Sequence, residues 1–369
     1  MKYRRSPIEI ESPEQFGYEN IECNLAESSV PDAHLKNLEI RLEDLVLQYG
    51  DHLGKPELRE LLASESDALE ASDVLLTVGA AGALFIVATS LLNKGDHVVA
   101  AFPNYVTNIE TPRTIDCEID YLHLKFDEGF RLDLDALSSL IGPRTRLVSL
   151  TSPHNPTGSV MSEEELFEVV RLVESTDATL LLDETYRGMS FSATPPLAAS
   201  LSPRAISVSS LSKTYGLPGI RLGWLVCRDA RLMETFLAAK EQIHISHSVL
   251  DEEVAFKYLL DKDTHLANIK RDIARKFDVM KAWMNDQDDL EWQEPAGGVV
   301  CFPRIKETVD VDPDAFYRVL NEKYKTFVGP GHWFEQDRRY MRIGYGWPTE
   351  QELEQGLKNI ARALRDTEK

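Results

Sequence analysis

The sequence predicts an α/β fold: a mixed, mostly parallel seven-stranded sheet flanked by helices, with a smaller α+β domain. Short apolar runs recur between residues 73 and 227, namely DVLLTVG, HVVAAFP, EIDYLHLKF, TRLVSLTSP, TLLLDET, AISVSSLSK and RLGWLVC. Helical patterns such as SEEELFEVVRLVEST separate several of these runs, as in a parallel sheet covered on both faces. The nearly continuous apolar run TLLLD is typical of a strand that is buried on both sides.

The segments before the sheet predict an arm and two helical stretches. Residues 1–35 are rich in Pro, Glu and Ser, which suits an arm lying across other structure. From Leu38 the pattern becomes helical, and after a glycine-containing turn a helix begins with Pro56 in its first turn. The last apolar run, RLGWLVC, follows the preceding strand after only a short turn, so we expect it to lie antiparallel.

The character of the chain changes after the seventh apolar run. A long helical stretch is expected over 251–285, followed by alternating strands and helices and an amphipathic helix over 350–368. We therefore predict a large domain of residues 36–262 and a small domain made of residues 1–35 and 263–369.

Composition narrows the range of partners. The chain has 369 residues and a formal net charge of −21, which argues against nucleic-acid binding. The simplest role of this negative charge is to keep the protein soluble. Its longest apolar run, AAGALFIVATSLL, is too short to span a bilayer and predicts a buried helix. The start of the chain lacks the apolar core of a signal peptide. Four scattered cysteines (Cys23, Cys117, Cys227 and Cys301) suggest neither a disulfide framework nor a zinc site. We expect a cytosolic protein with no nucleic-acid or membrane partner and no metal.

Residues suited to ligand binding follow several of the predicted strands. In open α/β sheets, ligands bind at the carboxyl ends of the strands. Each residue alone also fits a helix cap, a turn or a solvated side chain, but their recurrence at strand ends predicts one shared site. These residues are Ala80 and Ala81 after a glycine, Tyr105, Asn155 in HNPTG, Asp183 with Tyr186, and Ser210 with Lys213.

Five of these segments resemble a known family. The chain is similar to pyridoxal-phosphate-dependent enzymes of the class I/II aminotransferase family, which have the aspartate-aminotransferase-like fold, fold type I. The resemblance extends from Tyr49 to Arg342 and rests on YGDHLGKPELRE, NPTG, DETY, SLSKTYGLPGIRLGW and MRIGYG. It implies pyridoxal 5'-phosphate as the cofactor and an amino acid as the small-molecule substrate.

The resemblance implies a role for each residue around the cofactor ring. Lys213 would form the Schiff base with the cofactor aldehyde. Asp183 would keep the pyridine nitrogen protonated, so that the ring accepts electrons. Asn155 and Tyr186 would hydrogen-bond the phenolic oxygen, and Tyr105 would stack on the ring face.

The resemblance also implies how the phosphate is bound. The backbone amides of Ala80 and Ala81 would bind it at a helix N-terminus, with Ser210 and Arg221 adding a hydroxyl and a guanidinium. Relatives often carry a hydroxyl or a lysine where this chain has the two alanines. Tyr49 would reach the phosphate from a neighbouring subunit, which implies a homodimer with shared active sites.

Substrate contacts are predicted from both ends of the chain. Arg342 resembles the arginine that clamps the substrate's α-carboxylate, with a surface salt bridge as the alternative. Asn155 is a second expected contact. In NLAESSV, Glu27, Ser28 and Ser29 offer contacts for a polar or cationic substrate side chain, or else a strand edge or a cap.

The reaction type stays open between two alternatives. We expect an aminotransferase that moves the α-amino group to a 2-oxo acid. The same scaffold hosts lyases and cyclases, including capreomycidine-synthase-like enzymes that rework arginine-derived amino acids. His244, His247 and His332 are candidate acid–base groups for such a reaction, or structural residues. A regulatory module without catalysis is disfavoured, because no basic helix-turn-helix segment accompanies the domain.

Overall fold

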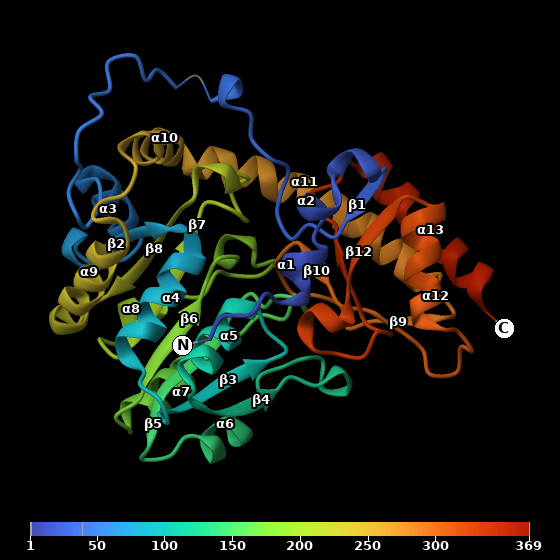
Figure 1. Ribbon diagram of the computed structural model, residues 1–369, viewed down its shortest axis with the longest axis horizontal. Helices are drawn as coiled ribbons and strands as arrows, with labels where there is room; N and C mark the ends of the chain where they lie inside the picture. Colours follow the sequence, from blue (N-terminus) through green and yellow to red (C-terminus); the bar gives the residue numbers. More distant parts are fainter. Residues whose placement is uncertain (1, 39, 369) are drawn as a thin grey trace.

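A computed structural model describes residues 2–38 and 40–368. Its main feature is a seven-stranded sheet with the order β2-β8-β7-β6-β5-β3-β4 (Figure 1). The strands β3 to β7 pair in parallel, and β8 is antiparallel to both of its neighbours. All seven predicted strands and the reversed direction of the last one are thus confirmed. Their bounds are β2 (Val74–Val78), β3 (His97–Phe102), β4 (Glu118–His123), β5 (Thr145–Thr151), β6 (Thr179–Asp183), β7 (Ala205–Ser210) and β8 (Leu222–Cys227).

Helices cover both faces of this sheet. Because side chains alternate along a strand, Val98 and Ala100 of β3 pack on one face, and Val99 and Ala101 pack on the other. The first face is covered by α4 (Gly79–Leu91), α5 (Val106–Ile115) and α9 (Ala230–His244), and the second by α6 (Leu134–Leu140), α7 (Glu163–Glu174) and α8 (Ala198–Leu201). The apolar run predicted as a buried helix is α4. No helix within residues 2–38 and 40–368 combines the length and apolarity needed to cross a bilayer.

A second, four-stranded sheet has the order β1-β12-β13-β10. Strand β1 belongs to the N-terminal arm and pairs in parallel with β12, so the first residues are built into this sheet. Figure 1 shows the arm passing between the two sheets before it reaches β1. The strands are β1 (Cys23–Leu25), β10 (Val300–Cys301), β12 (Thr326–Pro330) and β13 (Met341–Gly344); β9 (Leu290–Glu291) and β11 (Arg304–Ile305) form a two-stranded ribbon. The helices here are α1 (Pro7–Glu11), α2 (Pro13–Phe16), α11 (Lys262–Asn285), α12 (Pro313–Arg318) and α13 (Glu350–Thr367).

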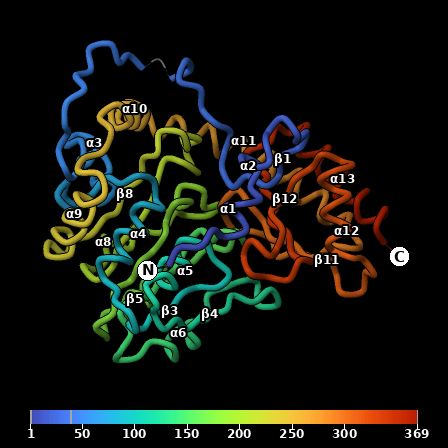
Figure 2. Tube along the Cα trace, viewed as in Figure 1, coloured from blue at the N-terminus to red at the C-terminus, as the bar shows by residue number. Residues whose placement is uncertain are grey.

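Two helical predictions need correction. The helix expected from Leu38 is wrong: residues 40–55 contain no helix before α3 (Pro56–Ala63) and form the long loop in Figure 2. Leu38 packs on a buried cluster, but Val46 and Leu47 are 66% and 75% exposed, so the segment lacks a continuous buried apolar face to stabilise a helix. The stretch predicted over 251–285 is two helices, because α10 (Val249–Leu259) ends before α11 begins.

Candidate active site

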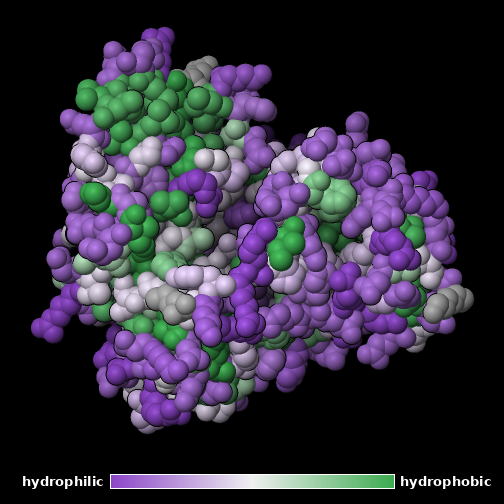
Figure 3. Space-filling view, viewed as in Figure 1, coloured by the Kyte–Doolittle hydropathy of each residue, from purple (hydrophilic) through white to green (hydrophobic). Residues whose placement is uncertain are grey.

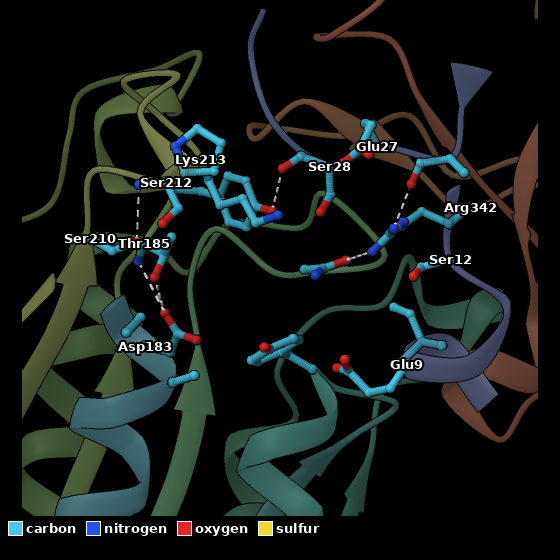
Figure 4. A pocket seen from close by; sticks show the side chains of 18 of the residues that line it. Glu9, Ser12, Glu27, Ser28, Asp183, Thr185, Ser210, Ser212, Lys213 and Arg342 are labelled. Atoms are coloured by element: carbon cyan, nitrogen blue, oxygen red, sulfur yellow. Dashed lines mark hydrogen bonds between the residues drawn. The ribbon is translucent and has the colours of Figure 1, made fainter. Parts of the chain in front are cut away.

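A cavity of about 340 Å³ lies where the carboxyl ends of the large sheet face the small sheet and the arm. Figure 4 shows Lys213 and Asp183 on one side of it and Arg342 and Glu27 on the other. The structure brings together most of the residues that the sequence predicts for the site. Those lining the cavity are Glu27, Ser28, Ala80, Ala81, Tyr105, Asn155, Asp183, Tyr186, Ser210, Lys213, Arg221 and Arg342.

Lys213 follows β7 and points into this cavity. Burial lowers the pKa of its ammonium group, because a low-dielectric surrounding disfavours the charged form. The carboxylate of Glu27 is the largest opposing influence on that pKa. A lysine that loses its proton readily has the nucleophilic amine needed to react with an aldehyde.

Asp183 is the last residue of β6 and is buried. Oδ1 of Asp183 accepts hydrogen bonds from the backbone amide of Thr185 at 3.1 Å and from the side-chain hydroxyl of Thr185 at 2.7 Å. Burial raises the pKa of Asp183, and the hydrogen bonds from Thr185 oppose the rise. The carboxyl group is therefore fixed in position and is buried without a cation, which suits it to face a protonated ring nitrogen.

The start of α4 forms a cradle for a phosphate. Gly79 has φ +66°, and a Cβ there would lie 2.7 Å from Nη2 of Arg221, so the guanidinium sits directly over the helix start. Gly223 of β8 packs against the same turn, where a Cβ would lie 2.6 Å from the amide nitrogen of Ala80. Amides at a helix N-terminus beside a guanidinium favour an anion. The residues present therefore fit a phosphate without help from side chains at Ala80 and Ala81.

Arg342 of β13 lies across the cavity from Lys213 and is only 4% exposed. Its Nη1 donates to Oδ1 of Asn155 at 3.1 Å, and its Nη2 donates to the carbonyl oxygen of Ala26 at 2.6 Å. Among the described residues its Nε has no hydrogen-bond partner. Arg342 lines the cavity, and a buried guanidinium with a donor left unpaired is suited to bind a carboxylate; a surface salt bridge is not its environment.

Two tyrosines complete the walls. The hydroxyl of Tyr186 donates to the carbonyl oxygen of Ser28 at 2.6 Å, which ties the loop after β6 to the arm. Burial raises the pKa of both Tyr186 and Tyr105, so both stay protonated and act as donors. Tyr105 is the N-cap residue of α5. Oδ1 of Asn104 accepts a hydrogen bond from the backbone amide of Tyr105 at 2.7 Å, which stabilises the turn before the helix.

Several predicted residues lie outside this cavity. Tyr49 is 80% exposed on the surface. Nε2 of His247 lies 3.0 Å from the carbonyl oxygen of Arg221, a structural contact. His332 lies between Glu11 at 2.7 Å and Arg338 at 2.8 Å, beside a neighbouring cavity. The remaining two, Ser29 and His244, are not among the residues that line the cavity either.

Sequence reasoning missed several residues of the arm and of the small sheet's loops. Glu9, Ser12 and Glu14 of the arm line the cavity, and Trp333 lines it from the turn after β12. The composition of the arm predicted that it crosses other structure, but no motif showed which side chains it presents. Within residues 2–38 and 40–368, no group of three or more histidine, cysteine or carboxylate side chains is placed to hold a metal ion.

Comparison with known proteins agrees with this geometry. The model of the family "Aminotransferase class I and II" matches residues 19–360. Capreomycidine synthase of Streptomyces vinaceus is 31% identical over 326 residues, 88% of this chain and 82% of that protein. The arginine–pyruvate transaminase of Pseudomonas aeruginosa is 27% identical over 305 residues, 80% of this chain and 77% of that protein.

The same fold occurs in a solved structure. A pyridoxal-phosphate-dependent aminotransferase from Streptococcus suis superposes with a TM-score of 0.92 over 100% of both chains, at 28% sequence identity. Its fold matches both the seven-stranded sheet and the flanking helices described above. This chain therefore belongs to the class I and II aminotransferase family and is a pyridoxal-phosphate-dependent enzyme of fold type I.

Proposed function

We propose that this enzyme is an aminotransferase that moves the α-amino group of an amino acid to a 2-oxo acid. One observation carries the proposal: Lys213, Asp183 and the buried Arg342 face a single cavity. An amine for the cofactor, a carboxylate for its ring and a guanidinium for the substrate's α-carboxylate are the groups that transamination requires. The cavity of about 340 Å³ includes the phosphate cradle at Ala80 and Arg221, so it is shared by the cofactor and the substrate.

The residues of the chain divide the work between them. When bound, pyridoxal phosphate supplies an electron sink for the bond that breaks at the substrate's α-carbon. Asp183 holds the proton on the pyridine nitrogen, and Arg342 orients the α-carboxylate. Lys213 would hold the cofactor through Nζ, and its neutral amine would accept the proton from the substrate's α-carbon as a base. Its lowered pKa favours the neutral amine that this step needs.

The walls of the cavity hold the cofactor in place. Tyr105 would stack on the ring and Asn155 would hydrogen-bond its phenolic oxygen. Tyr186 would join them once its hydroxyl turns away from the carbonyl oxygen of Ser28, to which it donates in this structure. Ala80 and Ala81 bind the phosphate through their amides. Ser210 and Arg221 contribute a hydroxyl and a guanidinium to the same phosphate, and Ser28 is a further substrate contact.

The test of the site is chemical labelling. Borohydride reduction of the loaded enzyme, followed by peptide mapping, should place a pyridoxyl group on Lys213. A Lys213→Ala variant should carry no label, and a label on another lysine would overturn the assignment.

A second candidate reaction is cyclisation or elimination. The 31% identity to capreomycidine synthase supports cyclisation. The 27% identity to an arginine–pyruvate transaminase supports the first candidate, transfer of the amino group to a 2-oxo acid. An aminotransferase given only an amino donor should convert its bound cofactor once and stop until a 2-oxo acid such as pyruvate is added. A cyclase should turn over repeatedly without any acceptor. Product mass spectrometry with and without pyruvate separates the two.

We also propose a homodimer with shared active sites. Figure 3 shows apolar surface at the end of the molecule where the loop before α3 and α10 lie. Tyr49 is on this surface and does not line the cavity of its own chain. A two-fold interface that buries these side chains would give Tyr49 a role in the partner's site. The exposed apolar residues here are Leu35, Val46, Leu47, Ile243, Ile245 and Leu250.

The cytosol is the compartment we propose. All four cysteines are free thiols in the structure, and Cys23, Cys227 and Cys301 are buried. Unpaired buried cysteines are typical of proteins that fold in a reducing compartment. Microscopy of a tagged full-length chain tests the assignment.

A further inference from the structure

The active-site cavity carries negative charge that the proposed reaction leaves unpaired. Its cationic lining residues are Lys213, Arg221 and Arg342, and each already has a partner in the proposed complex: the aldehyde, the phosphate and the α-carboxylate. Asp183 is paired with the ring nitrogen. The carboxylates of Glu9, Glu14 and Glu27 remain, and among the described residues none of them lies within 4.0 Å of a lysine, arginine or histidine nitrogen.

Glu27 is the best placed of these three carboxylates. It is half-buried, whereas Glu9 and Glu14 are exposed at the cavity mouth. Its Oε1 accepts a hydrogen bond from the hydroxyl of Tyr18 at 3.0 Å, which fixes the side chain. In Figure 4 it lies on the Arg342 side of the cavity, across from Lys213.

The backbone around Glu27 is held rigidly. The carbonyl oxygen of Ala26 accepts from Arg342 at 2.6 Å, and that of Ser28 accepts from Tyr186 at 2.6 Å. Gly344 of β13 packs directly against the carbonyl oxygen of Glu27, so position 344 has no room for a side chain. A carboxylate on such a support is preorganised and loses little conformational entropy when it binds a ligand.

A second feature favours an anionic group on this side of the cavity. Arg342 is buried, and its Nε has no hydrogen-bond partner among the described residues. If Arg342 binds the α-carboxylate there, the substrate is oriented beside Glu27. The substrate's side chain then extends from the α-carbon along a wall of the cavity that presents carboxylates and, among the described residues, no unpaired cation.

We propose that Glu27, with Glu14 and Glu9 at the cavity mouth, binds the positive end of the substrate's side chain, so that the enzyme selects amino acids ending in a guanidinium or ammonium group. This inference rests on the proposed function, because it takes Lys213 and Arg342 to bind the substrate's amine and carboxylate. Charge complementarity of this kind favours the cationic substrate and repels an acidic one.

The test compares substrates of equal length that differ in charge. For the loaded wild-type enzyme, kcat/KM for L-arginine should exceed that for L-citrulline by about 10- to 150-fold, the range that a charge-assisted hydrogen bond supplies. The ratio of kcat/KM for L-lysine to that for L-norleucine shows whether the enzyme also selects a side chain that ends in an ammonium group. Glu27→Gln keeps the size of the side chain and should abolish the preference, measured as the ratio of kcat/KM for L-arginine to kcat/KM for L-citrulline in the same variant. Glu22→Gln, at an exposed position before β1, is the matched control and should behave as wild type.

A binding measurement separates this inference from the proposed reaction. Calorimetry of the cofactor-free protein with the stable reduced adducts of pyridoxal phosphate with L-arginine and with L-citrulline should show the same preference, again lost in Glu27→Gln. If the adducts show the preference but no amino acid is turned over, the proposed reaction fails and the role of Glu27 stands. Equal binding and turnover of arginine and citrulline, or an unchanged preference in Glu27→Gln, would overturn the role of Glu27 alone. Failure to bind either adduct would overturn both.

Discussion

At the scale of single residues, Asp183 offers the most direct test of the chemistry. Asp183→Asn should retain bound cofactor but lose roughly a hundredfold or more in kcat, because a neutral amide no longer stabilises the protonated ring. Cofactor absorbance and steady-state kinetics measure the two effects separately. Asp177→Asn, just before the same strand and exposed, is the control. Near-normal turnover in Asp183→Asn would rule out its role.

Glu184, next in sequence, makes stability depend on pH. It is buried, its Oε2 has no hydrogen-bond partner, and burial raises the pKa of its carboxyl from the ordinary 4.5 to about 7. Between pH 4.5 and 7 the unfolded chain releases this proton and the folded chain keeps it. Glu184 therefore lowers the free energy of unfolding as the pH rises, by about 3 kcal/mol at most.

A substitution isolates this effect. Glu184→Gln should become progressively more stable relative to wild type from pH 4.5 to 7, with the full difference at pH 8. Urea unfolding at pH 5 and pH 8 measures it, with the exposed Glu164→Gln as a control. A stability difference that does not change with pH would contradict the prediction.

The residues that could be predicted from sequence share one property. Lys213, Asp183 and Asn155 follow strands, so their position at the sheet edge is set by local sequence. Glu9 and Glu14 could not be predicted, because their place in the cavity depends on how the arm folds back over the sheet. His332 sits in a polar sequence context that fits several roles, and only its contact with Glu11 shows a structural one.

At the scale of elements, the packing of β8 against the start of α4 connects fold and cofactor. Gly223→Ala places a Cβ against the Gly79–Ala80 peptide, which should cost about 1–3 kcal/mol of stability. It should also weaken cofactor binding, because the amides that cradle the phosphate are displaced. Fluorescence titration with the cofactor measures the affinity. Gly219→Ala meets no atom within 4 Å and is the matched control; equal affinity in the two variants would refute the packing argument.

Elements were predictable where local pattern and burial agree. The inner strands of the large sheet, such as β6, have nearly continuous apolar runs that a covered sheet accommodates, whereas the edge strand β4 alternates polar and apolar residues. The helix expected from Leu38 is wrong: Leu38 packs on a buried cluster, but Val46 and Leu47 are exposed, so the segment has no continuous apolar face buried within the chain. The pairing of β1 with β12 was invisible, since Cys23 and Thr326 are joined only through the tertiary fold.

At the scale of the whole molecule, the arm ties the two ends of the chain together. The division into residues 36–262 and residues 1–35 with 263–369 stays a prediction, although the pairing of β1 with β12 fits it. Limited proteolysis that cuts near residues 36 and 262 would support these boundaries. The loop before α3 exposes Val46, Leu47 and Tyr49, which the proposed homodimer would bury.

A mixing experiment tests whether that assembly completes the active site. Tyr49→Ala and Lys213→Ala should each be severely impaired, because one lacks the residue offered to the partner and the other lacks the cofactor anchor. When the two variants are co-refolded in equal amounts, half of the dimers should be mixed, and each of these has one intact site. Activity should then return to roughly a quarter of the wild-type value, well above the sum of the two variants. Sedimentation should show a dimer throughout, and a fully active monomer, or a mixture no better than its components, would overturn the shared site.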